Sequence, residues 1–199
     1  VFVRSPNSPT YAPGGSGPIH REKNFQICWN HPNADYRGAA ALCVGGTWYS
    51  ASFGTLEGNV WYHLVGTYDG ETLKAYKNGE LITENTSPSG NPDHETATLK
   101  VGRHALAEYY WEGKLAYARV YNRALSESEI KHNCDSPQSP VVNGLVVWLP
   151  LEEGSGSTVI DRSGNGNNGT IHGAAWDRWV FGQDVTEYCS RLERSFKAR

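Results

Sequence analysis

Apolar and polar residues alternate along most of this 199-residue chain, a pattern typical of strands with one buried face. In residues 25–30, for example, Phe25, Ile27 and Trp29 would share one face of a strand. Strands therefore dominate the expected structure. The same alternation predicts further strands at 39–44, 47–53, 60–68, 73–77, 80–83, 96–102, 114–121 and 145–151.

Turn residues separate these segments and predict how they are connected. Asp69-Gly70 marks a tight turn, and Asn78-Gly79 is the strongest signal for the two-residue turn of a β-hairpin, because glycine adopts the positive φ that other residues avoid. Tyr (11), Trp (7), Gly (22) and Pro (10) are abundant, and charged residues make up only 20% of the chain. This composition favours an all-β fold over a helical one. We expect a sandwich of two antiparallel sheets.

Three segments depart from the strand pattern. Ser126 to Glu129 has the form of a capping box, which predicts a short helical turn at residues 126–130. Residues 133–144 are rich in Pro, Ser and Asn and indicate a linker. An amphipathic helix is expected at 185–199, where apolar residues recur at helical spacing between charged ones. Its apolar positions are Val185, Tyr188, Leu192 and Phe196.

Charge and hydropathy argue against two classes of partner. Lys and Arg number 18 against 21 Asp and Glu, a net charge of −3, whereas a nucleic-acid binder needs a basic surplus. No apolar run reaches the roughly 18 residues of a membrane span. We therefore expect neither nucleic acid nor a membrane. The chain contains no Met and begins with Val1, which indicates a processed chain or a piece of a longer one.

The four cysteines form no CxxC pair and have no His at zinc-ligand spacing. An even number without a metal pattern predicts two disulfides and hence an oxidising compartment; buried thiols are the alternative. Cys28 and Cys43 lie on two connected strands, which favours a cross-strand bridge between them. Cys134 and Cys189 would then pair and hold the tail helix against the body.

Four segments together resemble a known family. They are residues 61–70 (WYHLVGTYDG), 73–81 (LKAYKNGEL), 99–103 (LKVGR) and 112–130 (EGKLAYARVYNRALSESEI). These are similar to the hairpins, closing strand and final turn of laminin G-like, concanavalin A-like domains. The resemblance implies a jelly roll of two antiparallel sheets. It also implies a secreted or cell-surface location and a role in glycan binding, adhesion or spacing.

A second match to the same family is out of order. Residues 144–158 (GLVVWLPLEEGSGST) and 161–170 (DRSGNGNNGT) are similar to the opening of such a domain, yet they follow its ending. The chain therefore divides into the later part of a jelly roll (residues 1–132), the linker, an opening part (residues 145–184) and the helical tail.

The opening part either completes a jelly roll or begins a second, unfinished domain. We favour completion, because an unfinished sandwich exposes an apolar face and unpaired strand edges. The family places its first and last strands side by side, so the strand at 145–151 is expected beside the strand at 114–121. Completion within this chain and completion in a neighbouring subunit both remain open.

Catalytic motifs are absent from the sequence. Glucanases of this fold carry alternating carboxylates along one strand, ExDxxE, which places acid and nucleophile about 5 Å apart. The chain has no such string, and the adjacent Glu152 and Glu153 would point to opposite faces of a strand. Nucleophile-elbow, HExxH and P-loop motifs are absent too. We predict that the protein is not an enzyme.

Aromatic residues near strand ends are the candidates for carbohydrate binding, because an exposed ring offers a flat apolar platform to sugar C–H groups. Three of them are consecutive and cannot all face inward on a strand. The alternative is that they pack in the core. The candidates are Trp48, Tyr49, Tyr109, Tyr110 and Trp111.

Calcium is the expected cofactor, in a structural role. The resemblance implies one Ca²⁺ where the opening and closing strands meet. Asp161, Asn165 and Asn168, with loop carbonyls, would supply the oxygen ligands of this hard cation. The closing strand of the family usually carries an Asp where this chain has Ala116, which weakens such a site. The alternative is that these residues only cap a glycine-rich turn.

Two functions remain in competition at this stage. The first is a non-catalytic extracellular recognition or adhesion module that binds a glycan or a cell-surface protein. The second is a structural subunit that assembles into an extracellular filament or oligomer by strand complementation between chains.

Overall fold

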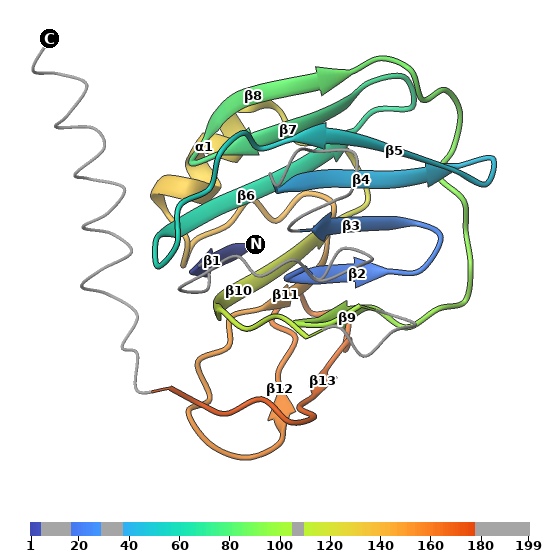
Figure 1. Ribbon diagram of the computed structural model, residues 1–199. Helices are drawn as coiled ribbons and strands as arrows, with labels where there is room; N and C mark the ends of the chain where they lie inside the picture. The colour runs from blue at the N-terminus through green and yellow to red at the C-terminus, as the bar shows by residue number, and fades with distance from the viewer. Residues whose placement is uncertain (5–16, 29–37, 105–109, 178–199) are drawn as a thin grey trace, which may run out of the picture.

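The computed structural model describes residues 1–4, 17–28, 38–104 and 110–177, which form two antiparallel sheets that face each other (Figure 1). The larger sheet has six strands in the order β11-β10-β1-β6-β7-β8. The expected antiparallel β-sandwich with a short helix is confirmed. The six strands are β1 (Phe2–Arg4), β6 (Trp61–Tyr68), β7 (Leu73–Lys77), β8 (Glu80–Asn85), β10 (Lys114–Tyr121) and β11 (Leu145–Leu149).

The smaller sheet has five strands in the order β5-β4-β3-β2-β9. A two-stranded ribbon lies outside both sheets and joins β12 (Thr158–Val159) to β13 (Gly169–Thr170). The hairpin expected at Asn78-Gly79 connects β7 to β8, with positive φ at both residues. The five strands are β2 (Ile19–Arg21), β3 (Phe25–Cys28), β4 (Ala39–Val44), β5 (Thr47–Ser52) and β9 (Lys100–Val101).

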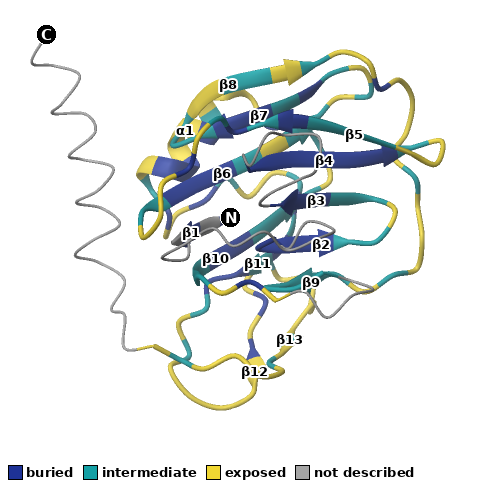
Figure 2. Ribbon diagram, in the orientation of Figure 1, coloured by how far each residue is buried: buried dark blue, intermediate teal, exposed yellow. Residues whose placement is uncertain are grey.

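The main core lies between the two sheets, where buried side chains from both inner faces form one cluster. Figure 2 shows buried residues along the strands of both sheets. Ile19, Ile27 and Leu42 from the five-stranded sheet share one cluster with Leu64 and Leu73 from the six-stranded sheet. Each buried side chain of this size contributes about 1.5–3 kcal/mol relative to exposure. The seam between the sheets therefore supplies much of the favourable free energy of folding.

Gly66 on β6 packs directly against Ala40 of the opposite sheet. A Cβ atom at this position would lie 2.6 Å from the Cβ of Ala40 on β4. Atoms at that distance overlap, so a larger side chain would force the sheets apart. The small residues at 66 and 40 therefore set the local spacing of the sandwich.

Helix α1 (Glu127–Asp135) begins with the predicted capping box. The Ser126 hydroxyl accepts from the backbone N–H of Glu129, and the Glu129 carboxylate accepts from the backbone N–H of Ser126. Hydrogen bonds from the Arg123 guanidinium and from Ser126 lower the pKa of Glu129 to about 2. The helix continues beyond residue 130 because Ile130, Asn133 and Cys134 are buried. The first three residues of the expected linker are therefore helical.

The expected position of the strand at 145–151 is confirmed. β11 pairs antiparallel with β10, with Ala118 opposite Leu149 and Val120 opposite Val147. Its residues Leu145, Val147 and Leu149 are buried. On the other face of β11, the indole of Trp148 contacts the Arg119 guanidinium, whose Cζ lies 5.4 Å from the ring centroid. The strand thus has contacts on both faces and completes the sheet edge within one chain.

The expected disulfide between Cys28 and Cys43 is wrong. Cys28 lies opposite Ala39, four residues before Cys43 on β4, so the two cysteines lie at opposite ends of the strand pair. Four residues of strand span roughly 13 Å, well beyond the reach of a disulfide. Both side chains are buried thiols; the Cys28 thiol donates to the carbonyl of Ala39 and that of Cys43 to the Asp93 carboxylate. Burial raises the pKa of Cys28 to about 12.

Of the second expected disulfide, between Cys134 and Cys189, the structure describes only Cys134. Cys134 is a buried thiol on α1. Cys189 and the helix expected at 185–199 lie outside the described residues. Among the residues that are described, no helix has both the length and the apolar content to cross a membrane.

Replacing Val147 by Asp tests whether β11 is part of the cooperative fold. Val147 is 8% exposed and packs with Leu149 and Val159, so Val147→Asp buries an unpaired carboxylate. We expect the free energy of unfolding to fall by about 3 kcal/mol or more, measured by urea denaturation followed through Trp fluorescence. The control Val142→Asp, at a side chain that is 77% exposed, should change it by less than about 0.5 kcal/mol. Equal midpoints for both variants would make residues 145–177 an appendage.

Candidate functional site

The outer face of the five-stranded sheet carries polar side chains that the main core does not use. Its register places Lys100, His20, Gln26, Ala41 and Ser50 in one row across β9, β2, β3, β4 and β5. Their neighbours along each strand point to the inner face, because successive side chains of a strand alternate. The same alternation that builds the core therefore selects this row.

Small side chains line the middle of this outer face, and two large rings lean over it. The ring centroids of Trp48 on β5 and His20 on β2 lie 6.3 Å apart. Their strands are three spacings apart, roughly 14 Å, so both side chains incline toward the middle of the face. Larger residues on β3 and β4 would occupy that space. The small residues are Cys28, Ala39, Ala41 and Cys43, each exposed by 2% or less.

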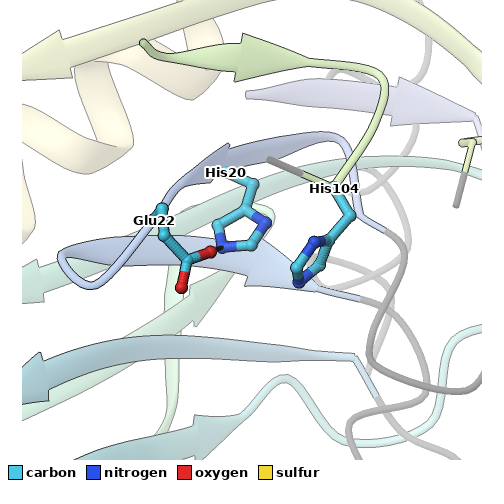
Figure 3. Close-up of side chains that lie close together, drawn as sticks. All are labelled: His20, Glu22 and His104. Atoms are coloured by element: carbon cyan, nitrogen blue, oxygen red, sulfur yellow. Dashed lines mark ion pairs between the residues drawn. The ribbon is translucent and has the colours of Figure 1, made fainter. Parts of the chain in front are cut away.

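Two imidazoles and a carboxylate meet at the β2 end of the row (Figure 3). Glu22 follows His20 by two residues, and its Oε2 lies 3.6 Å from the His20 Nε2. The ring of His104, which follows β9, meets that of His20 edge-on at 4.0 Å between centroids. One nitrogen or oxygen from each of the three side chains lies within 4.8 Å of the other two.

The chain reaches His104 through a sharp change of direction after β9. Gly102 has a φ of +80°, which glycine adopts without steric cost. Its N–H donates to the carbonyl of Pro18 at 3.0 Å, and its own carbonyl accepts from Trp111 at 2.8 Å. These contacts hold the residues after β9 against β2, beside His20.

Burial keeps the two imidazoles neutral at pH 7. His20 is 2% exposed, and burial together with the neighbouring His104 lowers its pKa to about 4. Burial also lowers the pKa of His104; the nearby Glu22 opposes this shift and Arg103 adds to it. The approach of Glu22 to His20 is therefore a contact with a neutral ring and not a salt bridge.

An exposed aromatic ring lies beside this cluster. Tyr110 is 54% exposed and forms an isolated bridge with Arg103. The Arg103 guanidinium lies over the Tyr110 ring, with its Cζ 5.4 Å from the centroid, and its Nε donates to the carbonyl of His104. Arg103 thus connects the exposed ring to the histidine pair.

The structure separates the five aromatic candidates. Trp48 lies on the outer face and is partly exposed, and Tyr110 lies beside it and is exposed; carbohydrate binding by either stays a prediction. Tyr49 points inward and packs on the main core, and Trp111, 9% exposed, belongs to that core. The expectation that Trp111 offers its ring to a ligand is wrong, because the sandwich buries it. Tyr109 lies outside the described residues.

Sequence reasoning missed His20, Glu22 and His104 as a group. The spacing of His20 and Glu22 is a usable signal, because residues two apart share one face of a strand. No local signal points to His104, which joins them only through the β2–β9 pairing.

The expected calcium ligands lie together, but their donors and acceptors are already engaged. Oδ1 of Asp161 accepts from the backbone N–H groups of Trp148 and Ser163. Its Oδ2 accepts from the Ser163 hydroxyl and the N–H of Asn167. These four donors match the roughly four lone-pair positions of a carboxylate. Burial acts to raise the pKa of Asp161, but the donors lower it below its ordinary value.

The two asparagines complete the same turn. Asn168 accepts from the backbone N–H of Asp161 through its side-chain oxygen. Asn165 donates through its amide nitrogen to the carbonyls of Leu145 and Val146 on β11. As arranged, the residues do not fit a calcium shell, since the carboxylate lone pairs are used and Asn165 presents a donor. The geometry favours the turn-capping alternative, and calcium binding stays a prediction.

Comparison with known proteins gives one family match. Residues 7–131 match the model of the concanavalin A-like lectin/glucanases superfamily, a laminin G model. No curated protein sequence matches the chain.

Two solved structures are similar. A candidate carbohydrate-binding protein from Bacteroides ovatus aligns with a TM-score of 0.64 and 22% identity, over 85% of this chain and 49% of that one. The chain thus spans about half the length of that protein. An S-layer domain-containing protein from Clostridium thermocellum aligns with a TM-score of 0.35 and 24% identity, over 55% of this chain and 62% of the other.

Replacing Asp161 by Ala should destabilise the protein whether or not calcium is present. The change leaves buried N–H donors of β11 and the turn without an acceptor, and we expect a loss of about 3 kcal/mol. The control Asp135→Ala removes a carboxylate that pairs with Lys131 on the surface of α1, and should cost less than about 0.5 kcal/mol. Both are measured by thermal melting with Ca²⁺ and with chelator. A calcium-dependent rise in melting temperature that Asp161→Ala abolishes would restore the metal interpretation.

Proposed function

Because the chain belongs to the concanavalin A-like lectin/glucanase superfamily, we propose that it is a non-catalytic recognition module that binds a glycan outside the cell or at its surface. The proposed binding surface is the rim of this outer face, where Trp48 and His104 are partly exposed and Tyr110 is exposed. One observation carries the proposal: aromatic rings and polar groups converge on a face that the main core leaves aside.

The chemistry of this face suits a sugar. An indole or phenol ring packs against the C–H groups of a pyranose, and neighbouring polar groups bind its hydroxyls. Arg103, beside Tyr110, supplies donors only, which favours glycans with oxygen acceptors such as carboxylates. The similar Bacteroides ovatus structure, described as a candidate carbohydrate-binding protein, supports the same class of ligand.

The non-catalytic part of the proposal rests on the carboxylates. The sequence lacks the ExDxxE string that glucanases of this fold use. Glu152 forms an ion pair with Arg162 at 3.2 Å, and Glu153 accepts from the backbone N–H of Ile160 at 2.9 Å. Both therefore serve the turn between β11 and β12.

Assembly by strand exchange has less support than glycan recognition. That alternative was considered because the sequence did not show whether the strand at 145–151 pairs within its own chain or with a neighbouring subunit. β11 occupies the edge beside β10 within the same chain, so no strand from a neighbour is needed there.

Trp48→Ala should weaken glycan binding at least about fivefold while the fold is retained, since a stacked ring contributes about 1 kcal/mol or more. Tyr110→Ala should act in the same direction. Binding is first detected on an oligosaccharide array and then measured by calorimetry with the best ligand. The loss should appear as a higher dissociation constant with an unchanged melting temperature for Tyr110→Ala, whose ring is exposed.

A matched control removes another indole away from this face. Trp176 donates to the carbonyl of Gly156 beside the β12–β13 ribbon, so Trp176→Ala should leave affinity unchanged. Trp111→Ala should instead lower stability by about 3 kcal/mol or more, as expected for a core ring. Equal affinities of wild type, Trp48→Ala and Tyr110→Ala would reject this face as the binding surface.

A further inference from the structure

We propose that His20, Glu22 and His104 form a binding site for a single Zn²⁺ ion at the β2–β9 edge of the five-stranded sheet (Figure 3). The proposal does not depend on glycan binding. It rests on the position, chemistry and burial of the three side chains.

The distances between the three potential ligand atoms are close to those of a zinc site. Ligand atoms about 2.0–2.1 Å from zinc in a tetrahedral arrangement lie roughly 3.3 Å from one another. His20 Nε2 and Glu22 Oε2 are 3.6 Å apart, and all three ligand atoms lie within 4.8 Å of one another. Rotation about the side-chain torsions of Glu22 and His104, both partly exposed, can close the remaining difference. His20, on β2, provides the fixed ligand.

Two imidazoles and a carboxylate favour Zn²⁺ over Ca²⁺ and Mg²⁺. Two imidazoles and one carboxylate are the donors of catalytic-type zinc sites, which keep a fourth position open for water or another ligand. Imidazole suits late first-row divalent ions, whereas Ca²⁺ and Mg²⁺ require shells of oxygen ligands. An imidazole binds a metal ion through one ring nitrogen in its neutral form, and a carboxylate binds it as the anion.

Glu22 brings one negative charge and Arg103, beside His104, one positive charge. A bound Zn²⁺ would attract the first and be repelled by the second. The Arg103 guanidinium can remain over the Tyr110 ring, whose π face attracts the cation. We therefore expect a site that depends strongly on Glu22.

A zinc ion here would have a mechanical effect on the sheet edge. It would join β2 to the residues after β9, which are otherwise connected through the two-residue pairing of β2 with β9 and the contacts of Gly102. Metal binding should therefore stabilise the folded state.

The experiment uses the full chain, freed of metal by chelator and kept reduced. Titration with ZnCl₂ in a calorimeter should give one site, and zinc should raise the melting temperature. Co²⁺ should give the ligand-field absorption of a low-coordinate nitrogen and oxygen site. Thiolate-to-cobalt charge-transfer bands would overturn the proposal, since they would assign the metal to cysteine. Excess Ca²⁺ should not displace the zinc, which separates this site from the Asp161 turn.

Two variants and one control locate the site. His104→Ala and Glu22→Gln should each weaken zinc binding at least about tenfold. His132→Ala should bind as wild type, because His132 is exposed on α1, which packs near β8 in the other sheet. Circular dichroism checks that each variant folds, and Glu22→Gln, nearly isosteric at a partly exposed side chain, decides the matter if His104→Ala does not. No zinc-dependent change in the wild type, or unchanged binding in Glu22→Gln, would overturn the proposal.

Discussion

The apolar seam between the two sheets is the interaction on which the rest of the structure depends. Once Ile19, Ile27 and Leu42 are buried against the six-stranded sheet, their neighbours on β2, β3 and β4 must point outward. His20 and Gln26 reach the outer face for this reason alone. The seam also sets the spacing of the sheets, since Gly66 and Ala40 meet where a larger side chain would not fit. Core packing and the candidate site thus both follow from the alternation of side chains between the two faces of each strand.

Closure of the sheet edge is a second condition of the fold. β11 pairs with β10, and the turn that follows is tied back to β11 by Asp161, which accepts from the N–H of Trp148. Asn165 reaches the carbonyls of the same strand from the other side of the turn. Backbone groups of an exposed edge strand would otherwise be left to water or to another chain. The polar turn therefore supplies hydrogen-bond partners to the backbone of β11, as a neighbouring strand does elsewhere in the sheet.

On the outer face, small residues leave room for larger side chains, and these lie beside a buried histidine. Alanines and cysteines on β3 and β4 leave room for the Trp48 indole to approach His20. Burial then lowers the pKa of His20 to about 4, so the ring stays uncharged at neutral pH. A neutral imidazole can accept from a sugar hydroxyl or bind a metal ion, whereas a protonated one can only donate.

The sequence by itself determined most of the strands, the hairpin turn at Asn78-Gly79, the capping box at Ser126 and the class of fold, because these depend on neighbours in the chain. It also placed β11 beside β10 through its likeness to an opening strand. It did not predict the short strands β1, β2, β12 and β13. Only the tertiary structure decided that Cys28 and Cys43 lie too far apart to pair, that Trp111 is core, and that His104 meets His20. These outcomes depend on register and on contacts between distant segments. Periodicity assigns a residue to a face, but it does not say which residue of another strand will lie opposite.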